Sequence, residues 1–299
     1  MNDFYHTIPD YKHVSGQIEW LAQHYENLKI FSIGKSVLTR EITALCIGNP
    51  CGATVFVGAT HGLEWLTSSL LLRFCHELLE ALKTGGHVSE IDVRRAMQKR
   101  SLVIIPCLNP DGVEIALHGK TGAMRLGNEV EHICGGDYSK WQANAHGVDI
   151  NHNFDAGWSI LRQTERENGI DAPAPTRYGG KHPHSEPETQ AATTFCMTWQ
   201  PRTLYSFHSQ GEEIYYHYGK HTPQRSRIIA NILAASSGYK VATPEGLAAH
   251  GGLKDWFIGK LRRPGFTIEI GLGKNPLELS ELDKIYQKTN ELLMIATLL

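Results

Sequence analysis

Two residues that could bind a metal ion stand three positions apart after a short apolar run. His61 and Glu64 follow the segment ATVFVGAT, which is rich in β-branched residues and ends in small ones. Such a run is typical of a buried strand, and open α/β sheets bind ligands at the carboxyl ends of their strands. An imidazole and a carboxylate at this spacing can bind one zinc ion, and a catalytic zinc site keeps one position open for water. The pair alone is weak evidence, because ordinary surface turns contain the same residues.

Two further residues of this kind belong to later apolar strands. His208 follows the segment RTLYSF, and Glu269 lies within FTIEI. Taken singly, His208 could be an ordinary strand-end histidine, and Glu269 could point to solvent from an edge strand. Together with His61 and Glu64 they form the set that a catalytic zinc site uses. Two histidines and one carboxylate bind the metal, and a second carboxylate takes a proton from water.

The elements that would position these residues alternate between strands and helices. A strand, a helix and a further strand in this order form a parallel pair with a right-handed crossover. We therefore expect a single domain over residues 1–299 with a three-layer α/β/α fold and a mixed, twisted central sheet. Strands are predicted over 53–57, 101–107, 202–207, 239–242 and 266–270, and helices over 14–28, 70–82, 185–198, 222–236, 251–261 and 279–298.

Three local patterns refine this picture. The β-rich runs 29–33 and 41–47 predict a hairpin at a sheet edge. The stretch 112–180 shows no convincing long helix, and the NPDG segment before it is a strong turn signal. Long irregular stretches within a compact domain are usually functional. Ser185 and Glu188, three residues apart, predict a capping box at the start of a helix.

The composition excludes several classes of partner. The chain has 299 residues and a formal net charge of -2, which gives no reason to expect nucleic acid or an anionic membrane. No run approaches 18 apolar residues, and the first residues lack the basic and apolar regions of a secretory signal. Six cysteines include no C-x-x-C pair. We expect a cytoplasmic protein, and the sequence leaves its oligomeric state open.

The motifs, taken in order, resemble those of the zinc carboxypeptidase family, the funnel-fold metallopeptidases. The matching segments are HGLEW (61–65), NPDG (109–112), GVDINHNF (147–154), SEPET (185–189), SFHSQG (206–211), GGLKDW (251–256) and FTIEIG (266–271). The resemblance implies one zinc ion held by His61, Glu64 and His208. It also implies a hydrolase in which Glu269 deprotonates a zinc-bound water that attacks an amide carbonyl and then protonates the leaving amine.

Several segments look more like one bacterial branch of that family. WQANAHGVDIN, HSQGEEIYY, GGLKDWFI and FTIEIGLGKNPL resemble the γ-D-glutamyl-diaminopimelate peptidases, or murein peptide amidases. This resemblance implies a small murein peptide as substrate, cut between D-glutamate and meso-diaminopimelate. Asn151 and Ser209 fall in its substrate-binding segments. Lys254 falls at the base of the pocket for the residue after the cut, where an ammonium would favour a remote carboxylate.

The chain departs from the family pattern at its substrate-binding arginines. His152 stands where an arginine that grips a terminal carboxylate is expected. The arginine that polarises the cleaved carbonyl corresponds to His146 in one register and to Gln142 in another, and Arg125 is a third candidate. We expect His146, His152 or both to face the zinc cleft, although histidine lacks the permanent charge of arginine. Leu247 stands at the position of the family's mobile tyrosine.

Two other functions remain open from the sequence. A related amidohydrolase of the acylase type would act on small N-acyl amino acids, but those members resemble HGNE at the metal, whereas this chain has HGLEW. A zinc-holding protein without catalysis would fit the missing arginines. Glu269 argues against that alternative, because a pure binding site needs no general base. A peptide-cleavage assay with and without a chelator separates the two classes.

Overall fold

An eight-stranded sheet runs through the computed structural model, which describes residues 5–244 and 246–299. Its strands are β1 (Leu28–Lys35), β2 (Glu41–Ile47), β3 (Thr54–Val57), β6 (Leu102–Ile105), β7 (Thr203–Ser209), β8 (Glu213–Tyr215), β9 (Lys240–Val241) and β10 (Gly265–Ile270). They lie in the order β1-β2-β6-β3-β7-β10-β8-β9. The predicted hairpin of β1 and β2 therefore forms one edge of the sheet.

The sheet is mixed, as the sequence predicts. β6, β3, β7 and β10 run parallel to one another, while β1, β2 and β8 each pair antiparallel with a neighbour. β3 lies directly beside β7, and β7 lies beside β10. Because parallel strands end at the same sheet edge, the residues that follow β3 meet the carboxyl ends of β7 and β10. The three-residue strand β8 was not predicted, because its pattern is too short to stand out from a loop.

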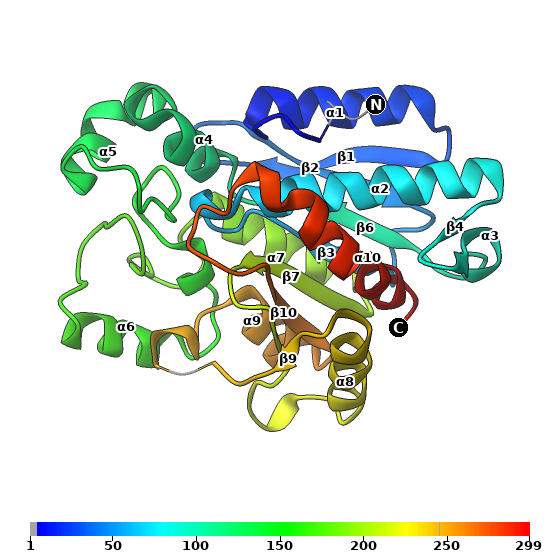
Figure 1. The fold of residues 1–299 in the computed structure, drawn as a ribbon. Coiled ribbons are helices and arrows are strands. Elements are labelled where there is room, and N and C mark those ends of the chain that lie inside the picture. Colours follow the sequence, from blue (N-terminus) through cyan, green and yellow to red (C-terminus); the bar gives the residue numbers. More distant parts are fainter. Residues whose placement is uncertain (1–4, 245) are drawn as a thin grey trace.

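Two helical layers cover the two faces of the sheet (Figure 1). The alternation of side chains along β3 shows how: Phe56 packs into one apolar cluster, while Val55 and Val57 pack into another. The Phe56 cluster includes α1 (Tyr11–His24), α2 (Leu66–Thr84), α8 (Arg225–Ser237) and α10 (Leu282–Leu298). The opposite cluster includes α7 (Pro187–Trp199) and α9 (Leu253–Leu261).

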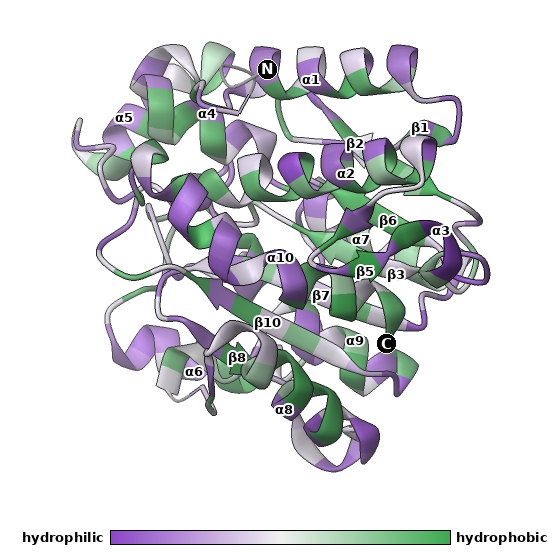
Figure 2. Cartoon of the chain, turned by 45° about the vertical axis from the view of Figure 1, so that its right-hand side comes forward, coloured by the Kyte–Doolittle hydropathy of each residue, from purple (hydrophilic) through white to green (hydrophobic). Residues whose placement is uncertain are grey.

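The pattern of hydrophobic and hydrophilic residues in the outer helices explains why these helices cover the core. Hydrophobic and hydrophilic residues alternate along α1 and α10, as expected of helices with one buried face (Figure 2). α2 spans 19 residues and ends at Gly85, whose φ of 79° is the left-handed conformation that glycine adopts without strain. No helix in the described ranges is long and apolar enough to cross a membrane.

The stretch after β6 is more helical than predicted. The NPDG segment starts a helix rather than only a turn: Asn109 accepts a hydrogen bond from the Gly112 amide, and Pro110 takes the first helical position. Short helices follow, and several of them pack with the loops around buried Trp141. The helices and small strands outside the main layers are β4 (His87–Val88), β5 (Ile91–Asp92), α3 (Val93–Ala96), α4 (Pro110–His118), α5 (Gly127–Cys134) and α6 (Trp158–Glu167).

The predicted capping box at the start of α7 is wrong. The residue at the N-cap is Glu186, and Ser185 donates its hydroxyl to the Glu186 carboxylate at 2.7 Å instead of capping the helix. Glu188 is fully buried and accepts a hydrogen bond from the Val37 amide at 3.1 Å. The Glu188 carboxylate therefore binds the backbone of the loop before β2, whereas in a capping box it would bind the backbone at the start of its own helix.

The turn after β3, which contains His61 and Glu64, has no space for a side chain at Gly62. β3 continues into a short 3-10 helix, η2 (Gly62–Glu64), and a Cβ atom on Gly62 would lie 2.3 Å from the Gly112 carbonyl oxygen. The Gly62 amide also donates to the Gln142 carbonyl at 3.0 Å. Because these neighbours are backbone atoms, they cannot move aside as a flexible side chain would. Gly62 therefore fixes how His61 and Glu64 leave the sheet.

We expect Gly62→Ala to lower the free energy of unfolding by about 1–3 kcal/mol and to weaken metal binding, because the added methyl group displaces the turn. Urea unfolding and metal analysis measure the two effects. Gly16→Ala is the matched control. Gly16 is exposed within α1 with nothing near its Cβ position, so that change should stabilise the helix by about 0.5–1 kcal/mol. Equal stability of both variants would contradict this account of the turn.

Candidate functional site

Three metal-ligand side chains converge at the carboxyl ends of β3 and β7. Glu64 lies between two imidazoles: one carboxylate oxygen is 2.9 Å from His61 Nδ1, and the other is 2.9 Å from His208 Nδ1. The two Nδ1 atoms are 3.3 Å apart. The structure thus brings together His61, Glu64 and His208, whose ligand atoms all lie within 4.8 Å of one another.

The outer nitrogens of both imidazoles contact oxygen atoms. His61 Nε2 lies 3.2 Å from the Asp149 carboxylate, and His208 Nε2 lies 3.0 Å from the Ser206 hydroxyl. Partners of this kind orient the imidazoles of metal-binding histidines and hold a proton on Nε2 when Nδ1 binds the metal. Glu64 and His208 are buried, which shields the cluster from water. The donor set and its supporting contacts fit a zinc ion.

The charges around the cluster favour a cation. Burial alone would lower the pKa of His61, but Glu64 and Asp149 outweigh it and hold that pKa well above its ordinary value. Burial alone would raise the pKa of Glu64, but His61 and His208 hold it well below the usual range. The carboxylates of Glu64 and Asp149, whose pKa values are both held low, therefore stay ionised at neutral pH, and a divalent ion at the three ligand atoms would face this negative charge.

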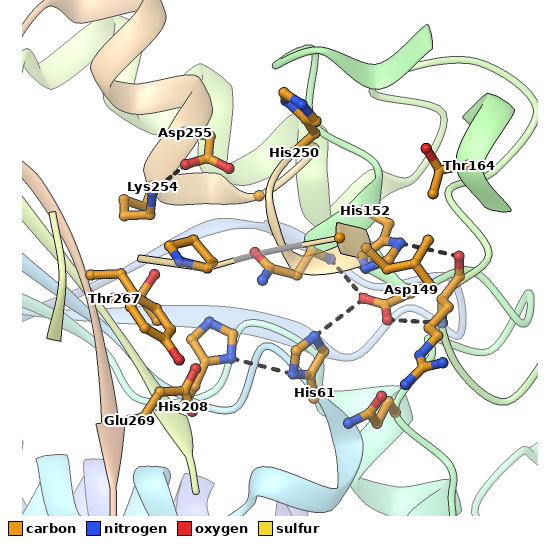
Figure 3. Close-up of a pocket in the computed structure, with 18 of the residues that line it drawn as sticks. His61, Asp149, His152, Thr164, His208, His250, Lys254, Asp255, Thr267 and Glu269 are labelled. Carbon is orange, nitrogen blue, oxygen red and sulfur yellow. Dashed lines mark hydrogen bonds and ion pairs between the residues drawn. The ribbon is translucent and has the colours of Figure 1, made fainter. Parts of the chain in front are cut away.

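Glu269 lies on β10, directly beside the ligand strand β7. In the sheet register its Cα pairs with that of His208, and both side chains line the same cavity (Figure 3). Burial, followed by repulsion from Glu64, raises the pKa of Glu269 well above its ordinary value. A carboxylate whose pKa is shifted toward neutrality accepts and returns protons efficiently. The position and the environment of Glu269 thus suit a general base.

The cavity over the cluster has a volume of about 570 Å³ and a mostly polar lining. Its size suits a small peptide rather than a folded protein. Of the predicted substrate-binding residues, it is lined by Gln142, Asn151, His152 and Lys254. It is also lined by residues to which the sequence analysis gave no role in the site: Asp149, Arg177, Tyr215, His250 and Asp255.

His146 does not lie where it was predicted. Its ring is half exposed, and Nδ1 lies 2.8 Å from a Glu186 carboxylate oxygen, a contact that raises the pKa of His146. It is absent from the lining of the cavity, as far as the described residues show. The prediction that His146 faces the zinc cleft is therefore wrong, because Glu186 at the start of α7 draws the imidazole away.

Two other predicted residues also lie outside the cavity lining that the structure describes. The Ser209 hydroxyl donates to the Asn275 side chain at 2.7 Å, and it is buried within the strand end. Arg125, the third candidate for the missing arginine, donates to the Val37 carbonyl at 3.0 Å. Both side chains are thus engaged in contacts within the protein.

His152, in contrast, is buried at the cavity wall. Its Nδ1 lies 2.8 Å from the Glu165 carboxylate and 3.1 Å from the Arg177 carbonyl oxygen. Glu165 also binds the Arg162 guanidinium, so the histidine is held by a buried network. This placement agrees with the prediction that at least one of the two histidines faces the cleft.

Lys254 also lines the cavity, but it is not the lone ammonium that was predicted. It forms a buried ion pair with Asp255 (Figure 3), and it donates to the His217 carbonyl at 3.1 Å. Burial raises the pKa of Asp255, and the lysine opposes that effect. This part of the cavity therefore presents one positive and one negative group side by side.

Asp149 and Arg177, which line the cavity without a predicted role, differ in whether the sequence contains a pattern that points to them. Asp149 lies within the GVDINHNF segment, so the motif itself contained it. Arg177 lies in an irregular segment, and no local pattern connects it with the strand ends. Its place in the cavity depends on how that segment folds back over Asp149.

Comparisons with known proteins identify a family, a relative of similar sequence and solved structures of similar fold. The model of a family described as zinc carboxypeptidase matches residues 16–292. The γ-D-glutamyl-L-diamino acid endopeptidase 1 of Lysinibacillus sphaericus is 32% identical over 282 residues, which is 93% of this chain and 69% of that protein. Bovine thrombin-activatable fibrinolysis inhibitor has a similar fold, with a TM-score of 0.77, 17% identity and coverage of 98% and 97% of the two chains. Murein-tripeptide amidase MpaA from Escherichia coli O157 aligns with a TM-score of 0.52, 21% identity and 90% coverage of each chain.

We expect the purified protein to bind one zinc ion per chain. His208→Ala should lose this ion, because only two of the three protein ligands remain. The loss in affinity should exceed the 10–100-fold that is typical of outer partners. Metal analysis after dialysis measures it. His146→Gln is the control and should keep both metal and activity. Stoichiometric zinc in His208→Ala would contradict the ligand assignment.

Proposed function

Because the chain belongs to the zinc carboxypeptidase family, we propose that this metallopeptidase cleaves the amide bond between a γ-D-glutamyl residue and a diamino acid. One of the similar proteins is named as a γ-D-glutamyl-L-diamino acid endopeptidase, and another is named as a murein-tripeptide amidase. The observation in this chain that supports the proposal most is the buried Lys254–Asp255 pair in the cavity.

The pair matches the chemistry of one kind of leaving group. The side chain of meso-diaminopimelate ends in an ammonium and a carboxylate on the same carbon atom. Asp255 can accept hydrogen bonds from the ammonium, and Lys254 can donate to the carboxylate. A lone lysine would favour a simple anion, and an apolar pocket would favour an aromatic or aliphatic side chain. The ion pair thus supports a zwitterionic group after the cleaved bond.

The other residues of the site have roles that follow from their positions. A zinc ion held by His61, Glu64 and His208 would supply a Lewis acid and an activated water. Glu269 takes the proton of the attacking water and passes it to the leaving amine. Asn151 accepts a hydrogen bond from the Leu253 amide at 3.1 Å, which fixes its side chain at the cavity wall beside α9.

Product analysis tests the proposed substrate. The zinc-loaded protein is incubated with L-alanyl-γ-D-glutamyl-meso-diaminopimelate, and the products are identified by mass spectrometry. We expect L-alanyl-D-glutamate and free diaminopimelate. An intact tripeptide, together with release of C-terminal amino acids from ordinary α-linked peptides, would instead identify a conventional carboxypeptidase.

We expect Glu269→Gln to keep its zinc and its fold but to lose about 10²–10⁴-fold in kcat, because the amide cannot accept the proton. Steady-state kinetics on the tripeptide and metal analysis of the same sample measure the two properties. Turnover near the wild-type rate would show that another group is the base.

We expect Lys254→Met to lower kcat/KM for a diaminopimelate leaving group by about 10–150-fold, the value of a charge-assisted hydrogen bond. A substrate with lysine at that position lacks the remote carboxylate and should lose much less. The preference between the two substrates is the quantity to compare. Lys260→Met, at an exposed position of the same helix, is the matched control. Equal losses on both substrates would contradict the pocket assignment.

A further inference from the structure

Besides Lys254, the cavity contains a further basic side chain, the guanidinium of Arg177. The residue is exposed and lines the same cavity as His61, His208 and Glu269. Its side chain forms no ion pair or hydrogen bond with any residue in the ranges 5–244 and 246–299, whereas the Lys254 ammonium is bound to Asp255. The Arg177 guanidinium is thus a cation of this cavity that can bind an anionic group of a substrate without first leaving a partner among the described residues.

The backbone of Arg177 is held firmly beside the metal cluster. Its amide donates to Asp149 at 3.0 Å, and the other Asp149 oxygen lies 3.2 Å from His61 Nε2. The Arg177 carbonyl oxygen lies 3.1 Å from His152 Nδ1. Its φ of 66° is left-handed, a conformation that is uncommon for residues other than glycine. Both backbone polar groups are therefore anchored to site residues, while the side chain keeps its full hydrogen-bonding capacity.

The two cations of the cavity lie at different walls. Figure 3 shows the Lys254–Asp255 pair on one side and Asp149 with His152, which hold the Arg177 backbone, on the other. His61 and His208 lie below and between these two walls in the same view. If the leaving group occupies the Lys254–Asp255 side, the part of the substrate before the cleaved bond extends toward the wall of Arg177.

We propose that Arg177 determines specificity by binding a free carboxylate on the substrate residue that precedes the cleaved bond. The assignment rests on the proposed function. In a γ-linked glutamyl residue the α-carboxylate takes no part in the cleaved amide and lies three carbon atoms from the reacting carbonyl. A guanidinium binds a carboxylate through two parallel hydrogen bonds. The Lys254–Asp255 pair and Arg177 then recognise the substrate on both sides of the metal.

Two tripeptides that differ at one group test this role. One contains γ-D-glutamate, and the other contains γ-D-isoglutamine, in which the α-carboxylate is an uncharged amide. The zinc-loaded wild-type protein should prefer the acid. Arg177→Gln should lower kcat/KM for the acid by about 10-fold, mainly through a higher KM, and leave the amide unchanged. The low end of the range for charged hydrogen bonds applies, because Arg177 is exposed.

Two further variants keep the result interpretable. Arg177→Lys retains the charge without the planar fork and should show an intermediate preference. Arg166→Gln removes an exposed arginine outside the cavity lining that the structure describes and should behave as the wild type. Thermal unfolding and zinc content confirm that each variant is intact.

The outcomes separate the two proposals. If Arg177→Gln keeps the wild-type preference for the acid, or loses activity equally on both peptides, Arg177 does not bind this carboxylate, although the substrate class stands. If the wild-type protein cleaves neither peptide, the proposed substrate fails and the role of Arg177 fails with it.

Discussion

The site depends on one carboxylate that lies between two imidazoles. Glu64 contacts His61 from its own turn and His208 from the neighbouring strand, at 2.9 Å in each case. This contact requires β3 and β7 to be adjacent and parallel, so that their carboxyl ends meet. It also requires the tight turn at Gly62 and the Thr67 hydroxyl, which donates to the Glu64 carbonyl at 2.7 Å. The metal-ligand cluster can therefore form only with this order of strands in the sheet.

Buried ionisable side chains around this cluster are arranged mostly in pairs. Asp149 faces His61, Glu165 faces His152, and Asp255 faces Lys254. Each pair reduces the penalty of burying its members and fixes side chains that would otherwise be mobile. Glu269 and Arg177 form no ion pair within the described residues, and we assign both of them a role on the substrate, as we do the Lys254–Asp255 pair. The Asp149–His61 and Glu165–His152 pairs thus belong to the framework of the site, whereas Glu269, Arg177 and the Lys254–Asp255 pair face the substrate.

Much of this arrangement could be predicted from the sequence, because strand ends leave local signals. The apolar runs before His61 and His208, and around Glu269, indicated the parallel strands, and the ordered motifs pointed to the family that the comparisons confirm. The orientation of side chains in loops had no such signal. His146 turns toward Glu186, a contact across 40 positions of sequence, and Arg177 reaches the cavity only because its segment folds over Asp149. Long-range contacts of this kind are fixed by packing, which periodicity does not encode.

The proposed activity requires a zinc ion bound by two histidines and a glutamate at the ends of β3 and β7. X-ray absorption spectroscopy of the zinc-loaded protein tests this claim most directly. We predict a ligand shell of nitrogen and oxygen at about 2.0–2.2 Å, with outer scattering from two imidazoles and none from sulfur. In His208→Ala the imidazole scattering should fall to that of one ring or disappear with the metal. A sulfur shell at about 2.3 Å, as from exposed Cys51, or zinc without imidazole scattering would contradict the account.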